Sequence, residues 1–188
     1  ESTGSGVYLQ HIIRQAAAAG HDSFLIAGMT GGRIPEFPGI SRNNCRFVRF
    51  SSDREGDLPF AVPGMSNVMP YPSCRFDSLS AGQLAMYEEA FAGAVRSAAA
   101  DFAPDILHSH HLWLASAVAR QVLPDIPMVT SCHSTDLRQF VQCLQLGERV
   151  LADCRRINRV LALSRDQQER ICQLYGIDRR RIDIVGGG

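Results

Sequence analysis

Short apolar segments alternate with helical patterns along this chain, and that alternation is the feature that most narrows its possible folds. Apolar runs typical of strands lie at residues 23–27, 45–50, 105–109, 127–131, 159–163 and 181–185. Helical patterns occupy residues 7–19, 81–102, 112–123, 137–154 and 165–175. Strands that alternate with helices form βαβ units, in which the strands are parallel and the helices cover the sheet. The sequence therefore predicts an α/β fold, a Rossmann-like parallel sheet with helices on both faces.

Local signals set the expected ends of these elements. Residues 81–102 carry one apolar stripe with a spacing of three or four, and residues 137–154 carry another, so each is predicted to be a single helix. Ser164 is predicted to cap the last helix, with Gln167 completing a capping box. Glycines and prolines dominate residues 28–39, which predicts a loop. Residues 51–78 are interrupted by prolines, which predicts a long irregular segment that carries specificity.

Composition excludes several classes of protein. The 188 residues carry 19 basic and 19 acidic side chains, and 45% of the residues are hydrophobic, which excludes a disordered chain. Zero net charge gives no general attraction to nucleic acid. No apolar run approaches the ~20 residues that span a bilayer. The six cysteines contain no C-x-x-C pair, and we expect them to be buried and reduced, as in a cytoplasmic protein of one domain.

Polar side chains gather just after three predicted strands. They are His108, His110, His111 and Trp113 after one strand, Cys132, His133, Ser134 and Asp136 after the next, and Ser164 after a third. Ligands of open parallel sheets bind beyond the carboxyl ends of the strands. Histidine titrates near neutral pH, so a cluster of histidines at this edge is a candidate site.

Other interpretations of the same residues stay open at this point. His108 also fits a buried histidine inside its strand, and His133 with Asp136 also fits the polar start of a helix. A metal site that uses His108, His110 and either Cys132 or His133 is a further alternative, although no spacing here is diagnostic.

Gly4-Ser5-Gly6 opens the first predicted helix. Glycines allow a backbone to approach a phosphate, and a helix N-terminus offers free N–H groups and positive potential. The dinucleotide-binding fingerprint is not met, because its third glycine would fall at Leu9. A plain loop at the start of a helix is the alternative interpretation.

Five segments, in the same order, resemble glycosyltransferases of family 4 in the two-Rossmann-domain (GT-B) class. They are residues 4–9 (GSGVYL) leading a helix that ends in Gly20-His21, residues 104–110 (PDILHSH), residues 127–130 (PMVT) with His133 and Asp136, residues 160–164 (VLALS), and residues 175–177 (YGI) followed by 181–185 (RIDIV). Together they span nearly the whole chain.

The resemblance implies that residues 1–188 form one Rossmann-like, N-terminal domain that binds the acceptor, with the C-terminal, donor-binding domain not in this chain. The full enzyme would be a retaining glycosyltransferase of the hexosyltransferase type, using a nucleotide-sugar as its donor and no metal or separate cofactor. The implied site residues are Gly4, Ser5 and Gly6 against the donor diphosphate, His133 beside the transferring sugar, Asp136 in support of its loop, His110 and Trp113 toward the interdomain cleft, and Ser164 at the substrate.

Two departures from the family pattern shape the expectations. The chain starts almost at the glycine segment instead of a strand, and it closes on three glycines where the family usually has Pro-Asn-Gly. We therefore expect this chain to be inactive alone and to need its C-terminal domain. The acceptor would be a sugar, a lipid or a small molecule, with peripheral contact at the inner face of the membrane for a lipid. A non-catalytic binding domain and another GT-B-like enzyme, such as a nucleotide-sugar epimerase, are the alternatives.

Overall fold

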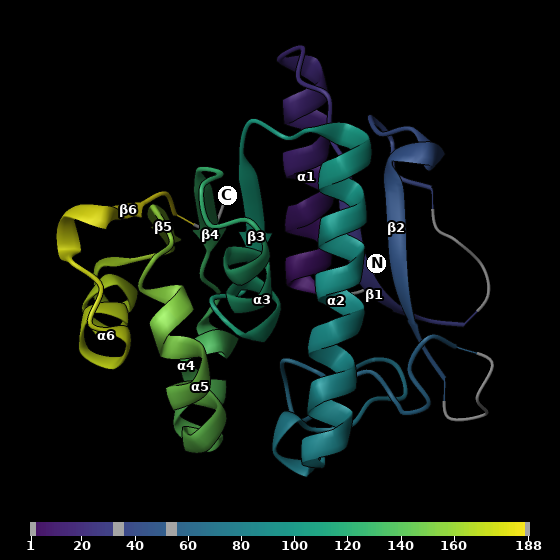
Figure 1. Cartoon of the computed structure of the whole chain (residues 1–188). Helices are drawn as coiled ribbons and strands as arrows, with labels where there is room; N and C mark the ends of the chain where they lie inside the picture. The colour runs from purple at the N-terminus through teal and green to yellow at the C-terminus, as the bar shows by residue number, and fades with distance from the viewer. Residues whose placement is uncertain (1–2, 32–35, 52–55, 187–188) are drawn as a thin grey trace. The chain divides into compact units, whose positions relative to one another are not determined.

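The computed structural model describes residues 3–31, 36–51 and 56–186, and all of the strands that it places in sheets are parallel (Figure 1). These residues divide into two compact units. The first unit lies within residues 1–64, 68–74 and 80–103, and the second within residues 65–67, 75–79 and 104–188. Parallel strands joined by helices confirm the predicted α/β, Rossmann-like class.

The first unit holds a two-stranded sheet and two helices. Its elements are α1 (Gly4–Ala18), β1 (Leu25–Thr30), a short 3₁₀ turn (Arg42–Asn44), β2 (Cys45–Phe50) and α2 (Ala81–Phe102). Phe50, 2% exposed, is the centre of the core. Its ring centroid lies 5.6 Å from Phe60, 6.0 Å from Tyr87 and 6.5 Å from Phe91, so α2 packs its apolar stripe on β2.

The second unit holds a four-stranded sheet in the order β3-β4-β5-β6. Its elements are a 3₁₀ turn (Phe76–Ser78), β3 (Leu107–His110), α3 (Leu114–Val122), β4 (Met128–Ser131), α4 (Ser134–Gln142), α5 (Leu144–Cys154), β5 (Arg159–Ala162), α6 (Arg165–Tyr175), a 3₁₀ turn (Arg179–Arg181) and β6 (Ile182–Ile184). The strand order follows the chain order, so each strand pairs with the next one through a helical connection. The carboxyl ends of all four strands therefore lie along one edge.

The single helix predicted over residues 137–154 is wrong. The chain forms α4 and α5, which meet at Cys143, where φ of −123° and ψ of 62° leave the helical region. Buried Gln139 donates from Nε2 to the carbonyl oxygen of Met65 at 3.2 Å. A Cβ at Gly147 would lie 3.2 Å from the ring of Phe140, so α4 and α5 pack too closely for a larger residue there. The break therefore depends on packing that the helical pattern does not contain.

The strand predicted over residues 23–27 lies later, at Leu25–Thr30, and includes Gly28, which was expected to begin a loop. A Cβ on Gly28 would lie 3.0 Å from Cε2 of Phe50, so the glycine leaves room for this ring in the core. Of that predicted loop, residues 32–35 lie outside the described residues.

The irregular segment predicted over residues 51–78 is confirmed where it is described, since residues 52–55 lie outside the described part. Isolated bridges join Leu58 to Phe50 and Pro63 to Cys74, without a regular strand. All six cysteines are free, as predicted, but only Cys132, Cys143 and Cys154 are buried, and the other three are partly exposed. Within the described ranges, no helix is long and apolar enough to cross a membrane.

Candidate functional site

The carboxyl edge of the second unit's sheet brings the histidines together. β3 runs to His110, beyond the predicted end of that strand at residue 109, and His110 lies opposite Ser131, the last residue of β4. The backbone N–H of His111 donates to the carbonyl oxygen of Ser131 at 3.0 Å, which continues the pairing for one residue past the strands. The two loops that follow β3 and β4 therefore start side by side.

Four imidazole rings lie close together at this edge, and we call them the histidine cluster: His108 and His110 from β3, His111 from the loop after it, and His133 from the loop after β4. The ring centroids of His108 and His110 lie 5.0 Å apart, and those of His110 and His133 lie 5.8 Å apart, with interplanar angles of 22° and 19°. His111 lies 4.7 Å from His133. Residues from two neighbouring strand ends thus present their rings together, as the sequence predicts.

Two rings of the histidine cluster, those of His110 and His133, are neutral at physiological pH. Burial lowers the pKa of His110 to about 3, and the neighbouring imidazoles of His108 and His133 lower it further. Burial and the nearby His111 also lower the pKa of His133. Protonating one ring would put a positive charge in a poorly solvated environment, next to other imidazole rings. The rings of His110 and His133 therefore act as hydrogen-bonding groups and not as cations.

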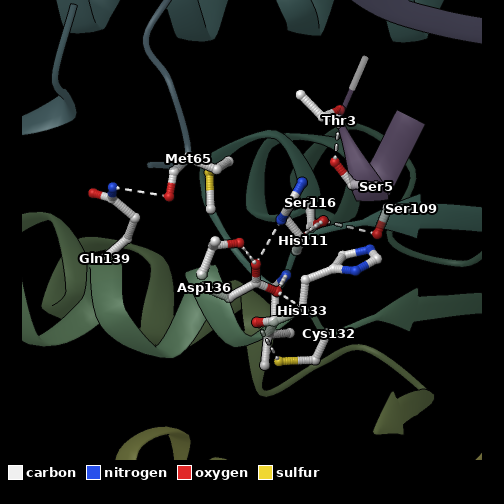
Figure 2. Close-up of polar contacts among 12 residues, drawn as sticks. Thr3, Ser5, Met65, Ser109, His111, Ser116, Cys132, His133, Asp136 and Gln139 are labelled. Atoms are coloured by element: carbon white, nitrogen blue, oxygen red, sulfur yellow. Dashed lines mark hydrogen bonds and ion pairs between the residues drawn. The ribbon is translucent and has the colours of Figure 1, made fainter. Parts of the chain in front are cut away.

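Asp136 joins the two loops at one carboxylate, as Figure 2 shows. Its side chain has no exposed surface, and Oδ1 lies 2.6 Å from Nδ1 of His111. Its Oδ2 accepts hydrogen bonds from the backbone N–H of Leu112 at 2.7 Å and of His133 at 2.9 Å. Burial alone would raise the pKa of Asp136, but His111 and the two amide donors reverse this effect and hold the pKa below its usual value. The group is therefore a buried anion.

His111 adopts a left-handed backbone conformation with φ of +69°, which is uncommon for a residue with a side chain. The next residue is held from both sides: Leu112 donates its N–H to Asp136, and its carbonyl oxygen accepts from the hydroxyl of Tyr175, which is fully buried. Ser116 donates its hydroxyl to the carbonyl oxygen of His111. The surrounding contacts thus fix a backbone conformation that costs about 1–3 kcal/mol.

A chain of hydroxyl groups lies beside the histidine cluster. Oγ of Ser109 lies 2.7 Å from Oγ1 of Thr130 and 2.7 Å from Oγ of Ser116. Thr130 and Ser116 have no exposed surface, so these groups satisfy one another within the fold. They tie β3, β4 and α3 together beneath the loops.

His133 and Asp136 occupy the polar start of α4, which confirms the structural interpretation of this pair. His133 is the N-cap residue, and Asp136 accepts from its backbone N–H in the manner of a capping box. The other structural interpretation, that His108 is buried within its strand, is wrong, because His108 is exposed. Within its unit β3 is an edge strand, so its side chains have a neighbouring strand on one side only.

The remaining residues predicted on this edge already have structural roles. Trp113 is 2% exposed and packs edge-to-face on Phe76, with ring centroids 5.9 Å apart. Ser164 caps α6, and its Oγ accepts from the N–H of Gln167 at 3.2 Å. The predicted reciprocal bond is different, because Oε1 of Gln167 accepts from the N–H of Leu163 instead of Ser164. Gln167 reaches one residue further back than a capping box requires.

Gly4, Ser5 and Gly6 lie in the first unit and form the first turn of α1 instead of a loop before it. Thr3 is the cap, and its Oγ1 accepts from the N–H of Gly6 at 3.2 Å. No atom of the described chain lies within 4 Å of a Cβ built on Gly4. The first amides of the helix have no acceptor within it, so this turn offers N–H groups to a ligand.

A metal site is the remaining alternative for the side chains at this edge. Across the described ranges, no three His, Cys, Asp or Glu side chains are placed so that they could hold a metal ion. The stacked rings of the histidine cluster face one another instead of converging on one point.

His111 is the residue of this edge that the implied site leaves out. The strand before His111 is predicted to end at Ser109. On that prediction His110, and not His111, is the first residue of the loop. The signal that identifies it is the continuation of β3 to His110, which makes His111 the first residue past the strand and the neighbour of Ser131.

Comparison with known proteins gives a family but little else. One similar solved structure is UDP-N-acetylglucosamine 2-epimerase from Rickettsia bellii, at 10% identity and a TM-score of 0.40, covering 87% of this chain and 45% of that chain. At that similarity the match says nothing about activity, and this chain spans less than half of that enzyme's length. A search of curated proteins finds no match. The model of Glycosyltransferase Family 4 matches residues 2–188, so the chain belongs to glycosyltransferase family 4.

Proposed function

We propose that this chain is the N-terminal, acceptor-binding domain of a retaining glycosyltransferase of the hexosyltransferase type, which transfers a sugar from a nucleotide-sugar to an acceptor. The observation that carries the proposal is the histidine cluster at the carboxyl edge of a parallel sheet, in a chain of this family. Open parallel sheets bind their ligands at this edge.

The chemistry of the cluster matches a sugar. A neutral imidazole donates one hydrogen bond and accepts another, and a sugar hydroxyl does the same. His133 would lie beside the transferring sugar, where a precisely placed polar group stabilises an oxocarbenium-like transition state. Asp136 would position His133 through its backbone N–H. His110 would lie beside the same sugar, Trp113 would support the loop from the core, and Ser164 would offer its hydroxyl hydrogen to the substrate.

The donor diphosphate would lie against the first turn of α1. Gly4 and Gly6 let the backbone approach the phosphate oxygens, and Ser5 adds a hydroxyl. The helix N-terminus supplies N–H groups and about half a positive charge. With a net charge of zero for the chain, phosphate recognition in this proposal uses backbone dipoles instead of a basic surface.

The proposal gives the chain several partners. Its own C-terminal domain would supply the rest of the donor site, so the chain alone would not transfer sugar. The acceptor would be a sugar, a lipid or a small molecule in the cytoplasm, and a lipid acceptor would bring the enzyme to the inner face of the membrane. Neither a metal ion nor a separate cofactor has a role in this scheme.

His133→Ala is the variant that tests this function, in the two-domain protein with a panel of nucleotide-sugars. Turnover is expected to fall about 100-fold, the usual loss when one polar group that stabilises the transition state is removed. The fold is expected to remain, because the capping bond at this position uses the backbone N–H. His11→Ala, an exposed histidine on α1, is the control. Wild-type turnover in His133→Ala would contradict the proposal.

Gly4→Ala tests the diphosphate site separately. The new methyl group meets no atom within 4 Å, so the free energy of unfolding is expected to stay the same or rise by up to about 1 kcal/mol, as for Gly to Ala in helices. A phosphate that lies on this turn would meet the methyl group, and nucleotide-sugar affinity is expected to fall about tenfold, or ~1.4 kcal/mol. Gly93→Ala in α2, where a Cβ also has open space, is the matched control for calorimetric titration. Unchanged affinity would remove the phosphate role from this turn.

A further inference from the structure

We infer that His111 is a further ligand-binding residue of this site, which Asp136 orients so that the Nε2 atom of its ring accepts a hydrogen bond from a hydroxyl group of a sugar. The inference rests on the proposed function, because it names the group that such a substrate would meet. It concerns the second unit alone and depends on the bond between His111 and Asp136.

The bond fixes which nitrogen of the ring carries the proton. Nδ1 of His111 lies 2.6 Å from Oδ1 of Asp136, a buried anion that can only accept. Nδ1 must therefore carry the hydrogen. In a neutral ring the other nitrogen then has a lone pair and no hydrogen, so Nε2 is a hydrogen-bond acceptor.

Nε2 is available to a ligand. The side chain of His111 is 19% exposed, and in the described part of the chain its one side-chain hydrogen bond is that of Nδ1 to Asp136. The neighbouring ring of His133, at 4.7 Å, belongs to the residue proposed to lie beside the sugar. A sugar that places one hydroxyl group at His133 can therefore place a neighbouring hydroxyl group at His111.

The backbone of His111 supports a binding role. The residue holds a left-handed conformation that a side chain disfavours, and backbone or hydroxyl contacts with Ser131, Ser116 and Asp136 maintain that turn. Strained residues that are fixed by several contacts are concentrated at binding sites, where they avoid reorganisation when the ligand arrives. The conformation and the bond to Asp136 together aim a single acceptor atom.

The two oxygens of Asp136 allow an unusually clean variant. Oδ2 accepts from both backbone N–H groups, of Leu112 and His133, whereas Oδ1 faces the ring of His111. In Asp136→Asn the amide oxygen can keep both backbone bonds while the amide nitrogen takes the place of Oδ1. That nitrogen donates to Nδ1, so the hydrogen of the ring moves to Nε2. The variant reverses Nε2 from an acceptor to a donor without removing any atom from the ring.

The second variant removes Nε2 alone. Asparagine tolerates the left-handed conformation better than most residues, and its amide nitrogen lies near the position of Nδ1. His111→Asn therefore keeps a donor to Asp136 and the backbone turn but has no atom at the place of Nε2. His11→Asn, on the exposed face of α1, is the matched control.

The experiment uses ring nitrogen and proton NMR of the ¹⁵N-labelled chain, with signals assigned through the backbone. The wild-type chain is expected to show the Nδ1–H form of His111, and millimolar glucose is expected to shift its Nε2 signal while inorganic phosphate does not. Asp136→Asn is expected to show the Nε2–H form and to gain a response to phosphate, which the acceptor nitrogen of the wild-type ring lacks. In His111→Asn, the shift that glucose causes at the Leu112 amide is expected to disappear, and in His11→Asn it is expected to stay.

Several results would overturn the inference. An Nε2–H form in the wild-type chain would do so, and so would a wild-type ring that responds to phosphate and not to glucose, because the site would then take an anion. A ring that neither probe moves would remove the binding role. A two-domain protein that does not bind a nucleotide-sugar would be a different result, because it would contradict the proposed transfer reaction. If the tautomer and the glucose response of His111 still hold, His111 remains a hydroxyl-binding residue.

Discussion

Asp136→Ala is expected to lower the free energy of unfolding by about 3 kcal/mol or more, because each buried donor that is left without its acceptor costs about 1–3 kcal/mol. The carboxylate accepts from Nδ1 of His111 and from the backbone N–H groups of Leu112 and His133. All of these donors lose their acceptor in a place that water does not reach, because the Asp136 side chain has no exposed surface. Urea denaturation of the chain measures the loss.

Asp166→Ala is the matched control for that experiment. Asp166 also lies in the first turn of a helix, α6, but it is exposed. Its loss is expected to cost no more than the 0.3–1 kcal/mol of a favourable charge at a helix N-terminus. Asp136→Asn is expected to fall between the two, since it can keep both backbone bonds. Equal losses in Asp136→Ala and Asp166→Ala would show that the buried carboxylate does not hold the loops.

Acidification is expected to destabilise the fold from about pH 6.5 downward, where histidine in an unfolded chain takes up a proton. Burial and the neighbouring rings lower the pKa of His110 to about 3 in the folded chain. Between these two pH values the unfolded chain binds a proton that the folded chain does not. The free energy of unfolding therefore falls by up to about 1.4 kcal/mol per pH unit for this group, and the full stability is present above pH 6.5.

His110→Gln is expected to remove most of that slope. Between about pH 6.5 and 5, above the range where most carboxylates titrate, the free energy of unfolding of His110→Gln should vary by about 1 kcal/mol per pH unit less than that of the wild-type chain. His133, whose pKa burial also lowers, contributes in the same direction and leaves a residual slope in the variant. His11→Gln, at an exposed position, is the control. Parallel curves for wild type and His110→Gln would mean that His110 is solvated in the folded chain.

Elements whose bounds are set by their own residues were predictable from the sequence. The strand over residues 45–50 and the helix over residues 81–102 have the predicted bounds. In the helix, Ser80 and Gln83 form a complete capping box, so the start is coded locally. The gathering of His110 and His133 at one sheet edge also followed from the sequence, because the order of strands and helices determines which strand ends meet.

What the sequence did not predict depends on contacts between distant residues. The break at Cys143 follows from the hydrogen bond of Gln139 to the carbonyl oxygen of Met65 and from the close approach of Gly147 to Phe140. The place of His111 follows from the one residue, His110, by which β3 extends past its predicted end. No periodicity or spacing reports such contacts, so the acceptor that orients His111 became visible only with the fold.

A single carboxylate that serves two loops makes them one cooperative unit. The amide hydrogens of Leu112 and His133 are bonded to the same oxygen of Asp136, although 21 residues separate them in the sequence. Neither amide can exchange with deuterium by opening its own loop without disturbing the acceptor of the other. Their exchange rates should therefore rise and fall together, and a ligand that steadies the loop after β4 would slow hydrogen exchange in the loop after β3, with no contact of its own there.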